Sequence, residues 1–220
     1  MIPVPPSSDS QGVAIVGFGD LGAQIASLLG FAGPGPDLVV FDDPAANSGA
    51  PYARPFEQYA DPRFAGREFY IGVGYRHMAV RIRLVDTLAA LGRRLPPLIH
   101  PSCHVSPGAS IGPGCVLYPM CNVDRNAVLE PGVLLHNSVV VSHDSVVGTG
   151  SYLAPGVVLS GNVRVGQGTF LGTGTLVANG VSIGRFVRVG IGTVVTSDIP
   201  DNHSAVGNPA RILSRPLRLR

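Results

Sequence analysis

The chain has 220 residues, with 16 basic and 14 acidic side chains, 29 glycines and 20 prolines. A net charge of +2, with no basic block before the C-terminal "RPLRLR", argues against nucleic acid as a partner. No apolar run approaches the length of a membrane span, about 18 residues, and the N-terminus lacks the charged and apolar regions of a signal peptide. We therefore expect a cytoplasmic protein that contacts neither membranes nor nucleic acid.

The N-terminal segment, 1–95, predicts strands that alternate with helices. The stretch "VAIVGFGDLGAQIASLL" predicts a strand, a glycine turn and an amphipathic helix, and "DLVVFDD" predicts a second strand. A third strand, "EFYIGVG", precedes a helix within "MAVRIRLVDTLAALG". Alternation of this kind is typical of a small parallel sheet. We therefore predict an α/β Rossmann-like domain over residues 1–95.

The glycine turn of this domain carries a nucleotide-binding pattern. Gly17, Gly19 and Gly22 form G-x-G-x-x-G, and Asp42 and Asp43 follow about 20 residues later. The domain provides only one mononucleotide-binding half, whereas a dinucleotide normally bridges two. The pattern therefore favours a phosphate or nucleotide at the turn, with Asp42 or Asp43 on a ribose or base, over an NAD-dependent reaction. A purely structural cap is the alternative.

The rest of the chain, 96–220, follows a six-residue period. Every sixth residue from Ile99 to Val195, seventeen positions in all, is Ile, Leu or Val; we call this the aliphatic series. Four residues after each member lies a small or β-branched residue, and these form the small series, Cys103 to Thr193. Hexapeptide repetition indicates a β-helix, with glycine and proline at its corners. Three hexapeptides would form one coil, so each residue would stack on its counterpart three repeats away.

Two histidines interrupt this pattern in "HNSVVVSHDS", His136 to Ser145. His143 belongs to neither series, and Gly161, three repeats further along, would stack on it with an open backbone N–H and room for a ligand. We therefore predict that His143, Asp144 and Gly161 form a functional site, with Asn137 nearby. His136 is either a pocket residue or an exposed surface residue. The Cys and His spacing matches no zinc site, so we expect no metal.

Several motifs together resemble one enzyme family. They are the N-terminal Rossmann-like domain, the uninterrupted hexapeptide helix, "SHD" (142–144), "SGNV" (160–163) and the closing "AVGNPARIL" (205–213). The chain resembles the left-handed β-helix sugar acetyltransferases typified by sialic-acid O-acetyltransferase and UDP-N-acetylbacillosamine N-acetyltransferase. The resemblance implies an all-β left-handed parallel β-helix after the α/β domain. It also implies acetyl-CoA as donor, a nucleotide sugar as substrate, and a homotrimer with each active site between two solenoids.

The resemblance also assigns roles to residues. It implies that His143 is the general base, that Asp144 steadies its ring, and that the Gly161 N–H binds the thioester carbonyl. The remaining positions matched for acetyl-CoA are Thr173, Ile191, Gly192, Asn208, Pro209 and Ala210. The positions matched for the sugar substrate are Gly17, Gly19, Asp42, Asp43, Gly74, His136 and Asn137.

Three departures from the family pattern stand out. The glycine turn often reads G-x-G-G-H in relatives, but here Asp20, which would repel a diphosphate, and Leu21 follow Gly19. His136 occupies a position where relatives often carry asparagine. Tyr152, nine positions after His143, occupies a place where they often carry a second histidine.

We therefore predict direct acetyl transfer from acetyl-CoA to an amine, favouring the 4-amino group of a nucleotide-linked amino-dideoxy sugar. His143 would take the amine's proton, since an ordinary histidine titrates near pKa ~6.5. Neighbouring residues of a strand point to opposite faces, so a His143–Asp144 contact requires a bend at Asp144. Two alternatives remain open: O-acetylation of a sugar hydroxyl, and a non-catalytic trimeric scaffold or sensor.

Overall fold

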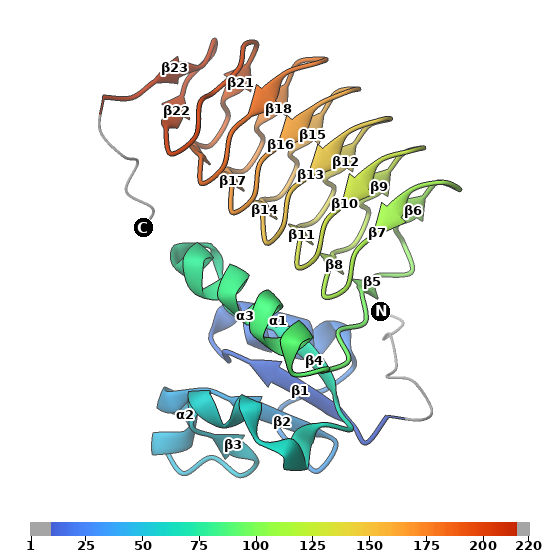
Figure 1. Ribbon diagram of the computed structural model, residues 1–220, viewed down its shortest axis with the longest axis vertical. Helices are drawn as coiled ribbons and strands as arrows, with labels where there is room; N and C mark the ends of the chain where they lie inside the picture. The colour runs from blue at the N-terminus through green and yellow to red at the C-terminus, as the bar shows by residue number, and fades with distance from the viewer. Residues whose placement is uncertain (1–9, 215–220) are drawn as a thin grey trace. The chain divides into compact units, whose positions relative to one another are not determined.

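The chain divides into two units, Met1–Pro96 and Pro97–Arg220, drawn from blue to red in Figure 1. The computed structural model describes residues 10–214. Within that range no helix is both long enough and apolar enough to cross a bilayer.

The N-terminal unit is a small parallel sheet with few helices. Its strands follow the order β3-β2-β1-β4, and the pairs β1–β2, β1–β4 and β2–β3 are parallel. The strands are β1 (Val13–Val16), β2 (Leu38–Phe41), β3 (Ala53–Arg54) and β4 (Glu68–Ile71). The helices are α1 (Asp20–Leu28), α2 (Asp43–Asn47) and α3 (Met78–Ala90), with short 3-10 helices η1 (Phe56–Ala60), η2 (Pro62–Phe64) and η3 (Tyr75–His77).

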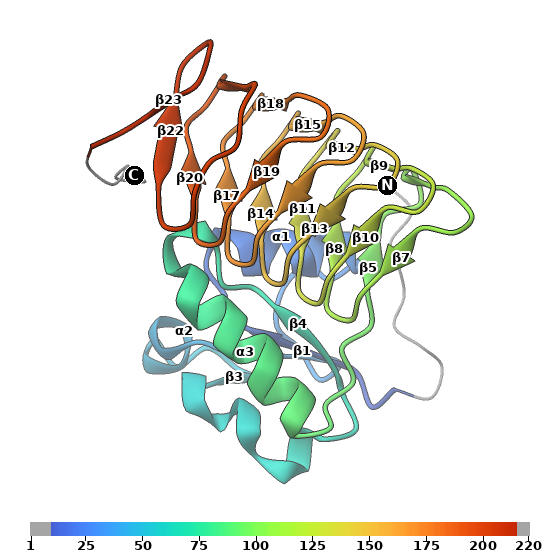
Figure 2. The same ribbon diagram turned by 45° about the horizontal axis from the view of Figure 1, so that its top comes forward.

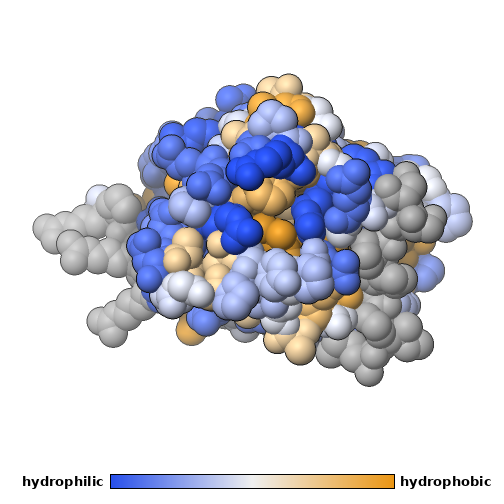
Figure 3. All heavy atoms as spheres, turned by 90° about the horizontal axis from the view of Figure 1, so that it is seen from below, coloured by the Kyte–Doolittle hydropathy of each residue, from blue (hydrophilic) through white to orange (hydrophobic). Residues whose placement is uncertain are grey.

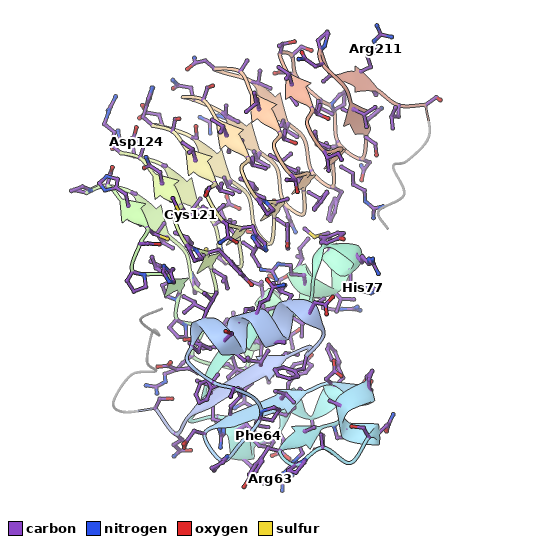
Figure 4. The ribbon with its side chains drawn as sticks, turned by 180° about the vertical axis from the view of Figure 1, so that it is seen from behind. Arg63, Phe64, His77, Cys121, Asp124 and Arg211 are labelled. Atoms are coloured by element: carbon purple, nitrogen blue, oxygen red, sulfur yellow. The ribbon has the colours of Figure 1, made fainter. Side chains whose placement is uncertain are left out.

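Continuous apolar sequence explains this sheet. The segments VAIV and LVVF are buried along their whole length, as expected for parallel strands covered on both faces. Phe41 stacks on Phe69 with ring centroids 6.3 Å apart, and Phe64, labelled in Figure 4, meets Phe41 edge-on at 5.0 Å. The face drawn in Figure 3 shows hydrophobic residues at its centre with hydrophilic ones around them.

The second unit is a parallel β-solenoid, whose stacked coils are visible in Figures 1 and 2. Its strands are β5 (Leu98–Ile99), β6 (His104–Val105), β7 (Ser110–Ile111), β8 (Val116–Leu117), β9 (Asn122–Val123), β10 (Val128–Leu129), β11 (Leu134–Leu135), β12 (Val140–Val141), β13 (Val146–Val147), β14 (Tyr152–Leu153), β15 (Val158–Leu159), β16 (Arg164–Val165), β17 (Phe170–Leu171), β18 (Leu176–Val177), β19 (Ser182–Ile183), β20 (Arg188–Val189), β21 (Val194–Val195), β22 (Ser204–Val206) and β23 (Arg211–Ile212).

The predicted stacking of positions three repeats apart is confirmed. Val140, for example, pairs with Asn122 below and Val158 above. The strands form three sheets: the first is β23-β22-β20-β17-β14-β11-β8-β5, the second β21-β18-β15-β12-β9-β6, and the third β19-β16-β13-β10-β7. From Leu117 to Val195 the aliphatic series is buried in one continuous core. Since each coil uses three strands, the period gives about six coils.

The small series tolerates polar residues because each finds a fixed partner. Ser145 Oγ donates to the Ser160 carbonyl at 3.0 Å, and Thr169 Oγ1 donates to the Gly184 carbonyl at 2.7 Å, the same sequence separation in both cases. Cysteine thiols use the same contact: Cys121, labelled in Figure 4, donates to the His136 carbonyl at 3.1 Å. No disulfide occurs among residues 10–214. These thiols therefore occupy the same structural place as the serine and threonine hydroxyls.

Sharp corners separate the strands of each coil. The residue three positions after each aliphatic-series member from Val105 to Val189 has a positive φ, and it is usually glycine or asparagine. Asp144 is one of these, with φ +59°. Asparagine and aspartate visit this region more readily than most side chains. The bend that a His143–Asp144 contact requires is therefore present.

Candidate active site

One corner of the solenoid collects the residues that the sequence singled out. At the corner between the second and third sheets, Arg125, His143, Gly161 and Asn179 follow one another at intervals of three repeats, and we call this column the His143 corner. Backbone bonds hold successive turns in register: the Asp144 N–H donates to the Arg125 carbonyl at 3.1 Å. In the same way, the Asn162 N–H donates to the His143 carbonyl at 3.0 Å.

His143 and Asp144 form a side-chain pair across the bend. His143 Nδ1 lies 2.8 Å from Asp144 Oδ2, and the two side chains are 39% and 35% exposed. The Asn126 amide donates to Asp144 Oδ1 at 2.9 Å, and the Arg125 guanidinium lies 3.7 Å from Oδ2. The hydrogen bonds from Asn126 and His143, with the Arg125 charge, hold the pKa of the Asp144 carboxyl below its ordinary value.

This pairing sets which ring nitrogen can act as a base. An ionised carboxylate only accepts hydrogen bonds, so the His143 Nδ1 must carry the proton in the 2.8 Å contact. The neutral ring then keeps its lone pair on Nε2. Nε2 is therefore the ring nitrogen available to accept a proton, and Asp144 holds the ring through Nδ1.

Gly161 lies directly against that nitrogen. A Cβ placed on Gly161 would lie 2.5 Å from both Nε2 and Cε1 of His143, closer than real Cβ contacts. Glycine therefore allows the ring to occupy its place. No residue in the described part of the chain accepts a hydrogen bond from the Gly161 N–H. A proton acceptor and an unused backbone donor consequently sit side by side.

His136 and Asn137 lie at a different corner, between the first and second sheets. The His136 ring stacks on Tyr118 with centroids 4.3 Å apart and planes 17° apart. Its Nδ1 accepts the Asn137 N–H at 2.9 Å. Burial lowers the pKa of His136, so the ring stays neutral to lower pH than an ordinary histidine. Tyr152 lies 6.4 Å from the ring, centroid to centroid.

Of the positions matched for acetyl-CoA, Gly161 lies in the His143 corner, whereas Thr173 and Ile191 share the corner of Asn137. Thr173 and Ile191 follow Asn137 two and three coils later, and we call this column, with Gly192, the Ile191 corner. The Ile191 side chain is 79% exposed. In one chain the second sheet separates the Ile191 corner from the His143 corner. The later positions lie between β22 and β23, where the Asn208–Pro209 peptide is cis and the Ala210 N–H donates to the Val194 carbonyl at 2.8 Å.

The N-terminal unit contains a cavity of about 220 Å³ at the carboxyl ends of β1 and β4. Open α/β sheets bind ligands at this edge. Gly19 and Gly74, two of the predicted substrate positions, line it, and a Cβ on either would meet no atom within 4 Å. The other lining residues are Asp20, Gly72, Tyr75, Arg76 and His77, the last labelled in Figure 4.

Sequence reasoning missed Tyr75, Arg76 and His77. They follow the third predicted strand, at the same sheet edge as the glycine turn. Because the carboxyl ends of parallel strands meet at one edge, the sequence could have indicated that these residues lie near the turn. The cavity thus contains one acidic side chain, Asp20, and two that can carry positive charge.

The remaining predicted substrate residues have roles within the fold. Asp42 caps α2 by accepting the Ala45 N–H at 3.0 Å, and its other oxygen accepts the Phe18 N–H at 2.9 Å. Asp43 accepts the Phe56 N–H through one oxygen at 2.7 Å. Gly17, with φ +87°, tolerates no side chain because a Cβ would lie 2.9 Å from Val73. Both carboxylate oxygens of Asp42 accept backbone N–H groups, whereas only one oxygen of Asp43 does.

Metal ligation has no candidate among the residues that the structure covers, because none of their His, Cys, Asp or Glu side chains form a group of three or more.

Comparisons with known proteins give one consistent result. No family model and no curated protein matches the chain. The acetyltransferase domain of PglB from Neisseria gonorrhoeae FA1090 is 30% identical, with a TM-score of 0.80 over 93% of this chain and 100% of that chain, and the same domain has been solved with acetyl coenzyme A. PerB from Caulobacter crescentus, in complex with CoA and GDP-perosamine, is 29% identical, with a TM-score of 0.80 over 92% of this chain and 97% of that chain.

The family resemblance that the sequence indicated is thereby confirmed. The similarity extends over both units, since the matches cover 92–93% of the chain. The parallel solenoid and the acetyltransferase relatives both support the same family. The chain belongs to the hexapeptide-repeat sugar acetyltransferases, and it is an acetyl-CoA-dependent acyltransferase.

Proposed function

We propose that this protein N-acetylates the 4-amino group of a nucleotide-linked amino-dideoxy sugar, with acetyl-CoA as donor and His143 as general base. The observation that carries the proposal is the group formed by the His143 Nε2, the Asp144 carboxylate behind the ring and the unused Gly161 N–H. The relatives support the substrate class, since one of them holds GDP-perosamine and is described as its N-acetyltransferase.

In the proposed reaction the amine nitrogen attacks the thioester carbonyl carbon. A C–N bond forms, the C–S bond breaks, and the nitrogen gives one proton to His143 Nε2. The Gly161 N–H stabilises the developing oxyanion, an interaction worth roughly 3 kcal/mol. His143 then returns the proton to the leaving thiolate, so the products are an amide and the coenzyme A thiol. Asp144 acts through the ring, by fixing its tautomer and stabilising its protonated form.

We further propose that residues 1–95 form a Rossmann-like domain that binds the nucleotide, and that 96–220 form a left-handed β-helix acyltransferase domain. The cavity beside Gly19 and Gly74 supports the first assignment, because backbone there can approach a phosphate closely. Asp43 has an oxygen available for a ribose or base. Arg76 and His77 would offset the negative charge of Asp20 toward a diphosphate.

The active enzyme is proposed to be a homotrimer with each site shared by two chains. Within one chain the Ile191 corner lies across the second sheet from His143, so a second solenoid would bring the two corners together. The Ile191 side chain, which is 79% exposed, is available for such a contact. Size-exclusion chromatography with light scattering tests this, because a monomer at micromolar concentration would rule out shared sites.

The activity itself is tested with acetyl-CoA and a panel of GDP- and UDP-linked sugars that carry either an amine or a hydroxyl at C4. We expect N-acetylated product only from the amines. Product from hydroxyl sugars alone would replace the proposal with O-acetylation, and absence of any product with every acceptor would refute it.

A further inference from the structure

Asn179 is a polar side chain in the His143 corner to which the reaction described above gives no role. It lies two coils after His143 and is exposed. Its carboxamide makes no hydrogen bond to any residue between 10 and 214, so folding does not use it. A side chain without a structural partner beside a catalytic base is available to a substrate.

The His143 and Asn179 side chains both lie against Gly161. The point where a Gly161 Cβ would lie is 2.5 Å from His143 Nε2 and 2.9 Å from Asn179 Oδ1. The two atoms are therefore no more than about 5.4 Å apart, a separation at which one ligand atom can contact both. Each of these atoms is a hydrogen-bond acceptor, because Nδ1 of the His143 ring carries the proton.

We propose that Asn179 is a specificity-determining residue that holds the second N–H of the acceptor amine and so favours an amine over a hydroxyl. The inference rests on the proposed N-acetyltransferase function. A primary amine brings two N–H donors to a site with two acceptors, one for Nε2 and one for Oδ1. A hydroxyl brings only one donor and leaves one of the acceptors unpaired.

The proton balance of the reaction agrees with this division of roles. The amine loses one proton to His143 as the C–N bond forms, and its other N–H remains in the amide product. That remaining N–H donates to Asn179 Oδ1 from the bound substrate through to the product, so the asparagine never accepts a proton itself. Because the nitrogen gains positive charge during attack, the contact strengthens in the transition state.

The test compares Asn179→Ala, which removes the acceptor, with Asn179→Asp, which keeps an acceptor oxygen. Gln167→Ala is a matched control, since Gln167 is an amide side chain at the same position of the hexapeptide on another corner. The substrate is GDP-perosamine, or whichever amino sugar nucleotide the wild type acetylates best. Thermal melting and acetyl-CoA binding confirm that each variant is folded.

We expect Asn179→Ala to lose about tenfold or more in kcat/KM for the amine, the cost of one hydrogen bond to a group gaining charge. Asn179→Asp and Gln167→Ala should stay within about threefold of wild type. The corresponding hydroxyl sugar should react no more slowly with Asn179→Ala than with wild type. If its rate is below detection in both proteins, the amine comparison decides.

Full amine activity in Asn179→Ala would overturn the inference, as would equal losses in the alanine and aspartate variants or equal losses on amine and hydroxyl. These outcomes leave the proposed function standing, because the wild type still acetylates the amine. Failure of the wild type on every amine would instead refute the proposed function.

Discussion

The His143 corner and the glycine turn of the N-terminal unit both join an aspartate to a donor, but they use the aspartate differently. Asp42 accepts two backbone N–H groups, those of Phe18 and Ala45, and thereby ties the turn to the end of β2. Asp144 accepts hydrogen bonds from two side chains, the ring of His143 and the amide of Asn126. Asp42 therefore holds backbone in place, whereas Asp144 holds the ring of a histidine that is 39% exposed.

The largest effect that this comparison predicts is at His143. His143→Ala should lower kcat by about 100- to 10,000-fold, because it removes the general base. The oligomeric state of the wild type and acetyl-CoA binding should be retained, since His143 lies outside the buried core. Steady-state kinetics and thermal melting are the measurements, and His104→Ala, an exposed histidine of the first coil, is the control. Loss of the folded state together with activity would mean that His143 maintains the fold, as Asp42 does.

Gly161→Ala should be the next most damaging change. The new methyl group would lie 2.5 Å from the His143 ring, so either the ring or the backbone must move. We expect kcat to fall by about 100-fold, because base and oxyanion donor are displaced together. Gly156→Ala tests a glycine with open space around it, although its positive φ adds strain of its own. Normal turnover in Gly161→Ala would show that the two groups do not act on one atom.

Asp144→Asn should lower kcat by a factor about ten times smaller than the factor for His143→Ala. The imidazole remains in this variant, but its tautomer is no longer fixed. The pKa of Asp144 lies below its ordinary value, so its carboxylate stays ionised as the pH falls through the range in which histidine gains a proton. Protonation of Asp144 should therefore not account for the acid-side loss of kcat/KM. Removing the negative charge should move that loss to lower pH, and an unchanged profile would contradict the pairing.

The smallest effects should appear at the two aspartates of the N-terminal unit, and they should differ in kind. Asp42→Ala should cost about 1–2 kcal/mol of stability through the lost helix cap, with little change in KM. Asp43→Ala should raise KM for the sugar nucleotide about 3- to 10-fold and leave that for acetyl-CoA unchanged. Chemical denaturation and two-substrate kinetics separate these outcomes. Equal effects on both KM values would mean that the acceptor lies elsewhere.

The sequence predicted the solenoid well because its period determines everything that stacks. Once three hexapeptides make a coil, His143 must lie under Gly161, and Asp144 must occupy a bend. The same period places Asn179 in the His143 corner. From sequence alone, however, an exposed asparagine cannot be told from any other surface residue, and only the structure shows its oxygen against Gly161. The N-terminal cavity was not predictable in this way, since Arg76 and His77 lie in a connection that no period places.

Two other features depend on what the sequence does not encode locally. The double role of Asp42 follows from its tertiary contact with Phe18, which is distant in the chain. The separation of the Ile191 corner from His143 follows from which corner each hexapeptide reaches, and we propose that a second chain joins them. Local patterns therefore pointed to the residues of the His143 corner but not to their surroundings.

The most direct test of the central claim, that His143 is the general base for an amine acceptor, is the deficit of His143→Ala at two pH values. The ratio of wild-type to variant kcat with an amino sugar nucleotide should be measured at neutral pH and again at a pH where the free amine is mostly neutral. A neutral amine is already a good nucleophile, so we predict that the deficit is large at neutral pH and shrinks at high pH. A deficit that stays equally large would contradict an amine acceptor, and wild-type turnover at neutral pH would contradict the role of His143 altogether.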